Sequence, residues 1–367
     1  MNILFIAPIP PPIDGQSKAS NMVLQKLKGE HNVFVINLSK KNLKNGAVSF
    51  SRIVAICRSL ILVFKNRKGN DIIYLSIAES FLGNLRDVFV YLICFTNINN
   101  IYIHMLGGAG MTKIINGNGL MSKVNRFFLK RLAGAIVEGS LNYETFSKVI
   151  SPEKVTIVPN FAEDYLFVED GEIEAKFVNL EVVEILYLSN LIPGKGYQEL
   201  IDAFFELDEI YKKQIRLTFV GGFESDKQSE EFKALIKRDK RVKYLGNFID
   251  GGEKRKLYCK THVFCLPTYY PFEGQPISIL EAYATGCVVI STNHSGIPFI
   301  FQDKTNGYMV EKGFVSSLKA ALENVVVDKM NLKSIAFHNR NIAKENYRST
   351  IFQTKIEELF LNHKRRE

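Results

Sequence analysis

Short apolar runs alternate with longer amphipathic segments along the first half of the chain. Each run is long enough for a buried strand, and the segments between the runs carry apolar residues at helical spacing. The predicted strands cover residues 2–7, 33–38, 71–76, 100–105, 134–139 and 154–160. The predicted helices between them include residues 17–28, 49–65 and 120–132. This alternation predicts βα units on a parallel sheet.

A second series of the same kind follows an acidic, weakly periodic segment. Its strands are predicted at residues 183–189, 214–222, 241–246, 262–267, 287–292 and 307–310, and its clearest helices at 199–207 and 277–284. We therefore expect four parts: an N-terminal Rossmann-like domain (1–160), a linker (161–182), a second Rossmann-like domain (183–330), and C-terminal helices (331–367) that pack back on the first domain. Ligands of open α/β sheets bind at the C-terminal ends of the strands, so we expect the site in a cleft between the domains.

Composition supports a folded protein of two domains. The chain has 367 residues, 46% of them hydrophobic, and no Trp. The segment "MNILFIAPIPPP" has no basic leader and predicts a buried strand rather than a signal peptide. No apolar run approaches the roughly 20 residues of a membrane span. Five cysteines without C-x-x-C spacing favour reduced thiols and a cytoplasmic location.

Charge is concentrated in the first half. Residues 1–160 contain 19 Lys and Arg against 8 Asp and Glu, a net +11, while the remainder carries −2. Basic residues recur near helical spacing at Lys123, Arg126, Lys130 and Arg131. This segment predicts either a helix on an anionic membrane surface or a core helix with a solvated basic face. The domain-wide charge favours the membrane, and no motif indicates nucleic-acid binding.

The segment "PFEGQPISILEAYATG" (271–286) places Glu273 and Glu281 around a Gly-Gln-Pro turn. Pro276 suits the first turn of a helix, so Glu273 is expected on the preceding loop and Glu281 about one and a half turns inside. A helix N-terminus favours an anion such as diphosphate, and carboxylates accept hydrogen bonds from sugar hydroxyls. The segment therefore predicts a site for a sugar attached to a phosphate. Two surface glutamates near a helix start are the simpler alternative.

Three further loops follow predicted strands. Lys195 lies between two glycines in "LSNLIPGKGYQELIDAF", and His104 ends a strand in "IYIHMLGGAG". The glycines after His104 lack G-x-G-x-x-G spacing, which disfavours a dehydrogenase, and a lone His is as often structural as functional. Gly15 and Gln16 open the helix after the first strand, where Gly15 gives either room for a phosphate or acceptor, or an ordinary turn.

The stretch "EGQPISILEAYATGCVVI", with "STNHSGIP" and "NGYMV" after it, resembles the signature of the family-4 glycosyltransferases, retaining enzymes of the GT-B fold. The resemblance implies two Rossmann-like parallel-sheet domains facing a central cleft. It implies that Glu273 contacts the donor sugar near its anomeric carbon, that Glu281 holds the ribose, and that Lys195 grips the diphosphate. His104 would face the donor sugar. The remaining implied donor-binding residues are Asn190, Gly274, Gln275, Pro276 and Ile277. Asn190 stands where the family has an Arg, so one usual cation is absent.

The resemblance also implies the activity. A hexose or N-acetylhexosamine would pass from a nucleotide-sugar, for which we expect UDP, to a glycan or lipid-diphosphate-linked acceptor in the synthesis of a surface polysaccharide such as O-antigen or capsule. The enzyme would act peripherally at the inner face of the plasma membrane. We expect no cofactor and no metal, because the sequence has no Asp-x-Asp and no metal-ligand spacing. The alternatives are a UDP-sugar epimerase and a catalytically dead sugar-nucleotide-binding protein.

Overall fold

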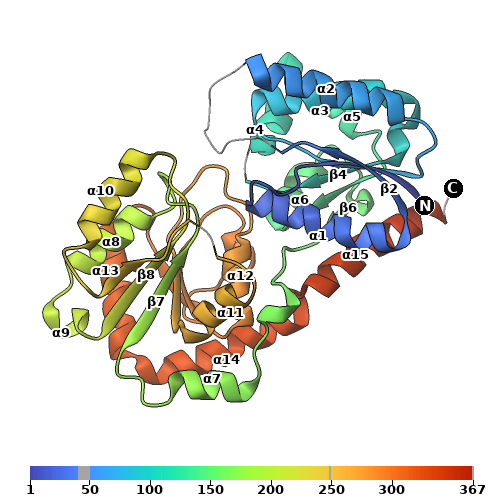
Figure 1. Cartoon of the computed structure of the whole chain (residues 1–367). Helices are drawn as coiled ribbons and strands as arrows, with labels where there is room; N and C mark the ends of the chain where they lie inside the picture. Colours follow the sequence, from blue (N-terminus) through green and yellow to red (C-terminus); the bar gives the residue numbers. More distant parts are fainter. Residues whose placement is uncertain (40–49, 109, 248, 366–367) are drawn as a thin grey trace. The chain divides into compact units, whose positions relative to one another are not determined.

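The chain folds into two compact units (Figure 1). The structure, a computed structural model, describes residues 1–39, 50–108, 110–247 and 249–365. The first unit comprises residues 1–160 together with 350–367, and the second comprises residues 161–349. Each unit has a six-stranded sheet in which every recorded strand pair is parallel.

The sheet of the first unit has the strand order β2-β1-β3-β4-β5-β6. Its strands are β1 (Asn2–Ala7), β2 (Asn32–Asn37), β3 (Ile72–Ser76), β4 (Ile101–Met105), β5 (Gly134–Val137) and β6 (Val155–Ile157). The six strands predicted for this half are thereby confirmed. The order changes direction at β1, so the C-terminal ends of β1 and β3 form the switch point of this sheet.

Helices cover both faces of the first sheet. They are α1 (Gly15–Glu30), α2 (Phe50–Asn66), α3 (Phe81–Ile93), α4 (Gly110–Asn116), α5 (Leu120–Leu129), α6 (Ser140–Ser147) and α15 (Ser349–Lys364). Figure 1 shows α2, α3 and α5 on one face and α1 and α15 on the other. The helix predicted at 120–132 ends at Leu129, and residue 49 of the helix predicted at 49–65 lies outside the described residues.

The second sheet has the order β12-β11-β10-β7-β8-β9. Its strands are β7 (Val183–Leu188), β8 (Ile215–Val220), β9 (Val242–Tyr244), β10 (Val263–Leu266), β11 (Val288–Thr292) and β12 (Gly307–Val310), again as predicted. The order changes direction at β7. The loops that follow β7 and β10 therefore meet at the switch point of the second sheet.

The second unit has its own helical layers. The helices are α7 (Asp170–Phe177), α8 (Tyr197–Phe205), α9 (Glu209–Lys212), α10 (Asp226–Ile236), α11 (Gly251–Lys260), α12 (Ile277–Ala284), α13 (Val315–Val327) and α14 (Lys329–Asn346). Figure 1 shows α8, α10 and α13 on one face of the sheet and α11, α12 and α14 on the other. Helix α7 packs on α14 and α11.

The segment expected to be a linker, 161–182, is part of the second unit. It contains α7, whose Ile173 is fully buried against Ala336 of α14. Two of its acidic residues stabilise the fold. Glu169 and Glu172 form a capping box at the start of α7, and Glu172 forms an ion pair with Arg255 at 2.8 Å. Capping and ion pairing, rather than solvation of a free connection, account for the acidic composition.

The C-terminal helices divide between the units. Helix α14 belongs to the second unit and α15, from residue 350, to the first. On α15, Phe352, Ile356 and Phe360 are buried, and the Phe360 ring lies 5.2 Å from that of Tyr102 and 6.3 Å from that of Tyr74. Of the segment 331–367 expected to pack on the first unit, only the last helix does so.

Candidate functional site

Two loops meet at the switch point of the second sheet. The β7–α8 loop carries Lys195, and the β10–α12 loop carries Glu273. The loops touch through their backbones: Tyr269 N donates to Gly194 O at 2.7 Å. Gly196 has a φ of +78°, and a Cβ there would lie 2.4 Å from Pro267 O, so only glycine allows this approach.

An ion pair joins the two loops. The Lys195 Nζ lies 2.7 Å from Glu273 Oε2, and the Thr268 hydroxyl donates to the same oxygen at 2.9 Å. The two side chains are only 13% and 9% exposed. The ammonium also lies 5.1 Å from the centre of the Tyr270 ring. A cation and a carboxylate are thus held together at the edge of the sheet where ligands of this architecture bind.

The segment after β11 forms hydrogen bonds with the backbone of the loop that carries Glu273. The Ser295 hydroxyl donates to the Glu273 carbonyl, and Gly296 N donates to Gly274 O at 3.3 Å. A ring nitrogen of His294, Nε2, lies 2.8 Å from Tyr270 O. The "STNHSGIP" segment noted in the sequence therefore fixes the backbone of the glutamate loop. Neither these contacts nor the role of Thr268 was assigned from the sequence.

The entry into α12 is buried. Gln275 and Ile277 are 3% and 7% exposed. Pro276 is the N-cap residue, with a φ of −66°, and α12 begins at Ile277, as the sequence predicted. The first amides of α12 follow Glu273 by a few residues, so the Lys195 ammonium and a helix N-terminus both offer positive charge to an anion at this loop.

Glu281 lies on α12 and faces α11. Its side chain is 4% exposed. One carboxylate oxygen accepts from Lys254 Nζ at 3.1 Å, and the other accepts from the Tyr258 hydroxyl at 3.3 Å. Glu281 is therefore tied to α11, whereas Glu273 is tied to the β7–α8 loop. Lys254 was not identified from the sequence, because only the fold brings it to Glu281.

Asn190 occupies the C-terminal end of β7, in the same loop as Lys195. It is half-buried, and its carbonyl accepts a hydrogen bond from the Tyr187 hydroxyl at 3.2 Å. The same hydroxyl donates to the Lys195 carbonyl at 3.3 Å. The buried Tyr187 thus ties both ends of the loop, which places the Asn190 amide and the Lys195 ammonium on one short, braced segment.

Gly15 and Gln16 lie at the switch point of the first sheet. They open α1, whose N-cap Asp14 forms a capping box with Ser17. The Gln16 side-chain amide donates to the Ser76 hydroxyl at the end of β3, at 3.0 Å. Gly15 is exposed with open space around its Cα, so this loop leaves room at the C-terminal ends of β1 and β3.

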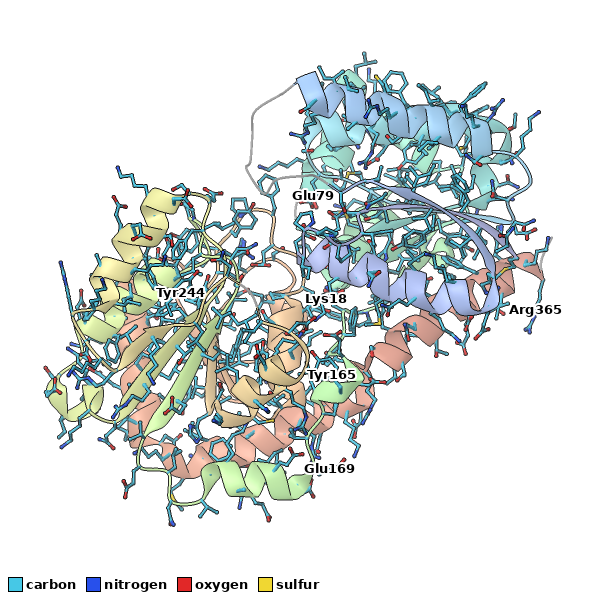
Figure 2. All side chains as sticks on the ribbon, viewed as in Figure 1. Lys18, Glu79, Tyr165, Glu169, Tyr244 and Arg365 are labelled. Carbon is cyan, nitrogen blue, oxygen red and sulfur yellow. The ribbon has the colours of Figure 1, made fainter. Side chains whose placement is uncertain are left out.

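Glu79 lies at the same edge and was missed in the sequence (Figure 2). It follows β3, and its Oε1 accepts from Gly110 N at 3.2 Å. A Cβ at Gly110 would lie 2.5 Å from the Glu79 Cβ, so the glycines after β4 make space for this side chain. Burial raises the pKa of Glu79 to about 7. A carboxyl group directly after a predicted strand was the available signal.

His104 has the surroundings of a core residue. It is fully buried, its Nδ1 lies 2.6 Å from the Tyr74 hydroxyl, and its ring lies 6.2 Å from that of Phe352. Burial lowers the pKa of His104 to about 3, so the ring is neutral at physiological pH. The expectation that His104 faces the donor sugar stays a prediction, and its side chain has no exposed surface. The structural alternative is the one that the geometry favours.

The described residues form neither a metal-binding cluster nor a membrane-spanning helix. In residues 1–39, 50–108, 110–247 and 249–365, no three His, Cys, Asp or Glu side chains come together in a way that would hold a metal ion. Within the same ranges, no helix combines the length and the apolar character that crossing a bilayer demands.

Comparisons with known proteins agree with this geometry. Residues 170–348 match the family model described as "Glycosyl transferases group 1". The capsular polysaccharide biosynthesis glycosyltransferase CapM of Staphylococcus aureus is 22% identical over 66% of this chain and 64% of its own length. An Escherichia coli UDP-Gal:alpha-D-GlcNAc-diphosphoundecaprenol alpha-1,3-galactosyltransferase is 24% identical over 58% of this chain and 55% of its own. The chain spans about half the length of the curated relatives it matches.

Solved structures share the whole architecture. Anabaena HepE in complex with UDP-glucose superposes with a TM-score of 0.69 at 16% identity, covering 99% of this chain and 100% of the other. Sucrose-phosphate synthase from Thermosynechococcus elongatus gives a TM-score of 0.74 at 15% identity, covering 98% of both chains. These matches confirm the predicted GT-B fold of two Rossmann-like parallel-sheet domains.

Proposed function

Because residues 170–348 match the family model of the glycosyl transferases group 1, we propose that the protein is a retaining glycosyltransferase of polysaccharide biosynthesis. The donor is a nucleotide-sugar that carries a hexose or an N-acetylhexosamine. The acceptor is a glycan or a lipid-diphosphate-linked oligosaccharide. The observation that carries the proposal is the Lys195–Glu273 pair at the switch point of the second sheet.

The pair suits the charges of sugar transfer. The bond between the anomeric carbon and the phosphate oxygen breaks, which leaves positive charge on the sugar and negative charge on the diphosphate. Glu273 lies near the sugar, and Lys195 with the α12 amides stabilises the diphosphate. The acceptor oxygen bonds to the anomeric carbon on the same face, and its proton passes to the leaving phosphate oxygen.

Two findings support UDP as the nucleotide and a lipid diphosphate as the acceptor carrier. HepE, which shares the fold, binds UDP-glucose. The Escherichia coli relative is named for a UDP-galactose donor and a diphosphoundecaprenol acceptor. We propose that this protein uses substrates of the same classes. Its Asn190, which is uncharged, leaves Lys195 as the cation of the β7–α8 loop that would bind diphosphate.

A nucleotide screen followed by a transfer assay tests the proposal. A ligand at 100 times its Kd stabilises the folded protein by roughly 2.7 kcal/mol, so UDP-, GDP- and ADP-sugars are compared by thermal shift. The best donor is then incubated alone and with sugar diphosphate-lipid acceptors. Transfer supports the proposal, an epimer formed from donor alone identifies an epimerase, and binding without either reaction identifies a dead site.

Variants link that activity to the site. Glu273→Gln is expected to lower kcat strongly, because the substituted amide has no charge to offer the sugar. Glu281→Gln is expected to weaken donor binding by roughly tenfold or more, because charge-assisted hydrogen bonds contribute about 1.5–3 kcal/mol. Glu311→Gln, on an exposed loop of the same unit, is the matched control. Wild-type kinetics in a folded Glu273→Gln variant would contradict the site assignment.

We also propose that the first unit binds the anionic inner face of the plasma membrane, through a surface that shares only the end of the basic segment noted in the sequence. Phe128 on α5 and Leu132 just after it are buried, and Arg126 donates to two backbone carbonyls, so these residues serve the fold. An aromatic–basic surface lies on α2, on α5 and on the segments that follow α2, α3 and α5. It comprises the exposed Phe64, Phe95, Phe127 and Arg131 and the half-buried Arg67.

Contacts within the aromatic–basic surface form two groups, one around Phe127 and one at Phe64. The rings of Phe95 and Phe127 stack at 6.4 Å, and the Arg131 guanidinium lies 3.8 Å from the Phe127 ring centre. The Arg67 guanidinium lies 3.8 Å from the Phe64 ring centre. Exposed aromatic rings beside cations suit the interface of an anionic bilayer, where each cation contributes about 1 kcal/mol.

Sedimentation with liposomes tests the membrane proposal. The protein is expected to pellet with phosphatidylglycerol vesicles at low salt and to be released as salt shortens the Debye length. Lys130→Glu with Arg131→Glu should weaken binding, whereas Lys312→Glu with Lys333→Glu, both exposed on the second unit, should not. Equal sedimentation with neutral and anionic vesicles, or none at low salt, would refute the proposal.

A further inference from the structure

A buried lysine joins three carboxylates in the second unit. Lys254 of α11 is 3% exposed. Its Nζ lies 3.1 Å from Glu281, 3.0 Å from Glu163 and 3.1 Å from Asp250. These partners belong to three elements: helix α12, the segment before η3 (Asp164–Leu166), and the N-cap of α11. One ammonium group therefore contacts three carboxylates from three elements of the unit.

Two tyrosines complete the cluster. The Tyr258 hydroxyl donates to Glu281 at 3.3 Å, and the Tyr165 hydroxyl lies within 3.4 Å of Glu163 and 3.3 Å of Asp250 (Figure 2). Burial raises the pKa of both tyrosines, so they remain neutral hydrogen-bond donors. Glu281 is thus held from one side by a cation and from the other by a neutral hydroxyl.

A carboxylate as buried as Glu281 needs such partners. Removal of the cation would leave a buried charge without its partner, which is costly. Each oxygen of an ionised carboxylate has lone pairs for more than one donor, so a contact to Lys254 or Tyr258 does not by itself saturate that oxygen.

We propose that Lys254 is a positioning residue for nucleotide binding: it keeps the Glu281 carboxylate ionised and oriented to accept hydrogen bonds from the ribose hydroxyls of a nucleoside diphosphate. This inference rests on the proposed function, because it takes a nucleotide ribose to bind at Glu281. It goes beyond that function in assigning the discrimination between ribose and 2′-deoxyribose to an ion pair from a different helix.

The test compares the Kd values of UDP and 2′-deoxy-UDP by calorimetry. The wild type should bind UDP at least tenfold more tightly, because the deoxy analogue leaves a buried charged acceptor without one of its donors. In Lys254→Met the Kd of 2′-deoxy-UDP should be no more than about threefold that of UDP, chiefly because UDP binds more weakly. A purely structural role for Lys254 would weaken both nucleotides equally and leave the ratio unchanged. Lys254→Arg should restore part of the ratio, and Lys256→Met, exposed on the same helix, should preserve it.

The outcomes separate this inference from the proposed function. A wild type that binds UDP, GDP and ADP no better than their 2′-deoxy forms refutes ribose binding at Glu281. A wild type that discriminates, with Lys254→Met discriminating equally, refutes only the role of Lys254. Should Lys254→Met fail to fold, Glu163→Gln serves instead. This variant removes a carboxylate that competes with Glu281 for the Lys254 Nζ, so the ratio of the Kd of 2′-deoxy-UDP to that of UDP should rise. An unchanged or lowered ratio overturns the proposal.

Discussion

Removing one partner of the Lys195–Glu273 pair should destabilise the protein more than removing both. Lys195→Met leaves the Glu273 carboxylate, whose side chain is 9% exposed, with the Thr268 hydroxyl but without its cation. Breaking a buried ion pair from one side costs about 3–5 kcal/mol. Because the lysine side chain is 13% exposed and one hydrogen bond remains, we expect the lower end, about 3 kcal/mol.

Calorimetry of the ligand-free protein measures this cost. For a unit of this size each kcal/mol shifts the Tm by about 2–4 °C, so Lys195→Met should lower the Tm of the second unit by roughly 6–12 °C. The double variant Lys195→Met/Glu273→Gln has no stranded charge and should recover about half of this loss or more. Lys312→Met, on an exposed loop, provides the baseline for a lysine substitution.

Two results would refute this reasoning. If Lys195→Met unfolds within about 1 °C of the wild type, the pair is not desolvated in solution. If the double variant is no more stable than the single one, the cost comes from lost packing of the lysine chain, and the stranded carboxylate contributes nothing measurable.

Three further expectations follow from the same geometry. Lys195→Ala should lower kcat by about 10²–10³, measured as sugar transfer under saturating donor, because its charge faces the leaving diphosphate. EDTA should leave transfer unchanged, and loss of activity that Mn²⁺ restores would contradict a metal-free mechanism. The pKa of Glu79, raised from 4.5 to about 7, makes protonation favour the folded state, so the stabilisation present below pH 4.5 is lost as pH rises through 7. Between pH 5 and pH 8 the free energy of unfolding of the wild type, measured in urea, should therefore fall by about 2–3 kcal/mol more than that of Glu79→Gln. An equal fall in both proteins would contradict the raised pKa.

The strands were predictable because most are short apolar runs that the fold buries, and every predicted run overlaps a strand of the structure. The acidic segment 161–182 misled us because a capping box and an ion pair to Arg255 have the same composition as a solvated linker. Local pattern cannot show partners that are distant in the sequence. Glu273 and Lys195 were found through a motif, but the roles of Thr268 and Lys254 depend on contacts between loops and helices. For His104 the position was predicted but the burial was not, because a place at the end of a strand does not show whether the ring is buried or exposed.

The return of α15 to the first unit has a consequence for synthesis. Phe352, Ile356 and Phe360 are buried in the first unit, yet a ribosome makes them only after residues 161–349. At roughly 5–20 residues per second, the nascent first unit waits about 10 to 40 s with the apolar sites for these side chains uncovered. The second unit is contiguous in sequence and is able to complete its core first. An expressed fragment ending at residue 160 would therefore be an incomplete unit, whereas residues 161–349 form a self-contained fragment for nucleotide-binding experiments.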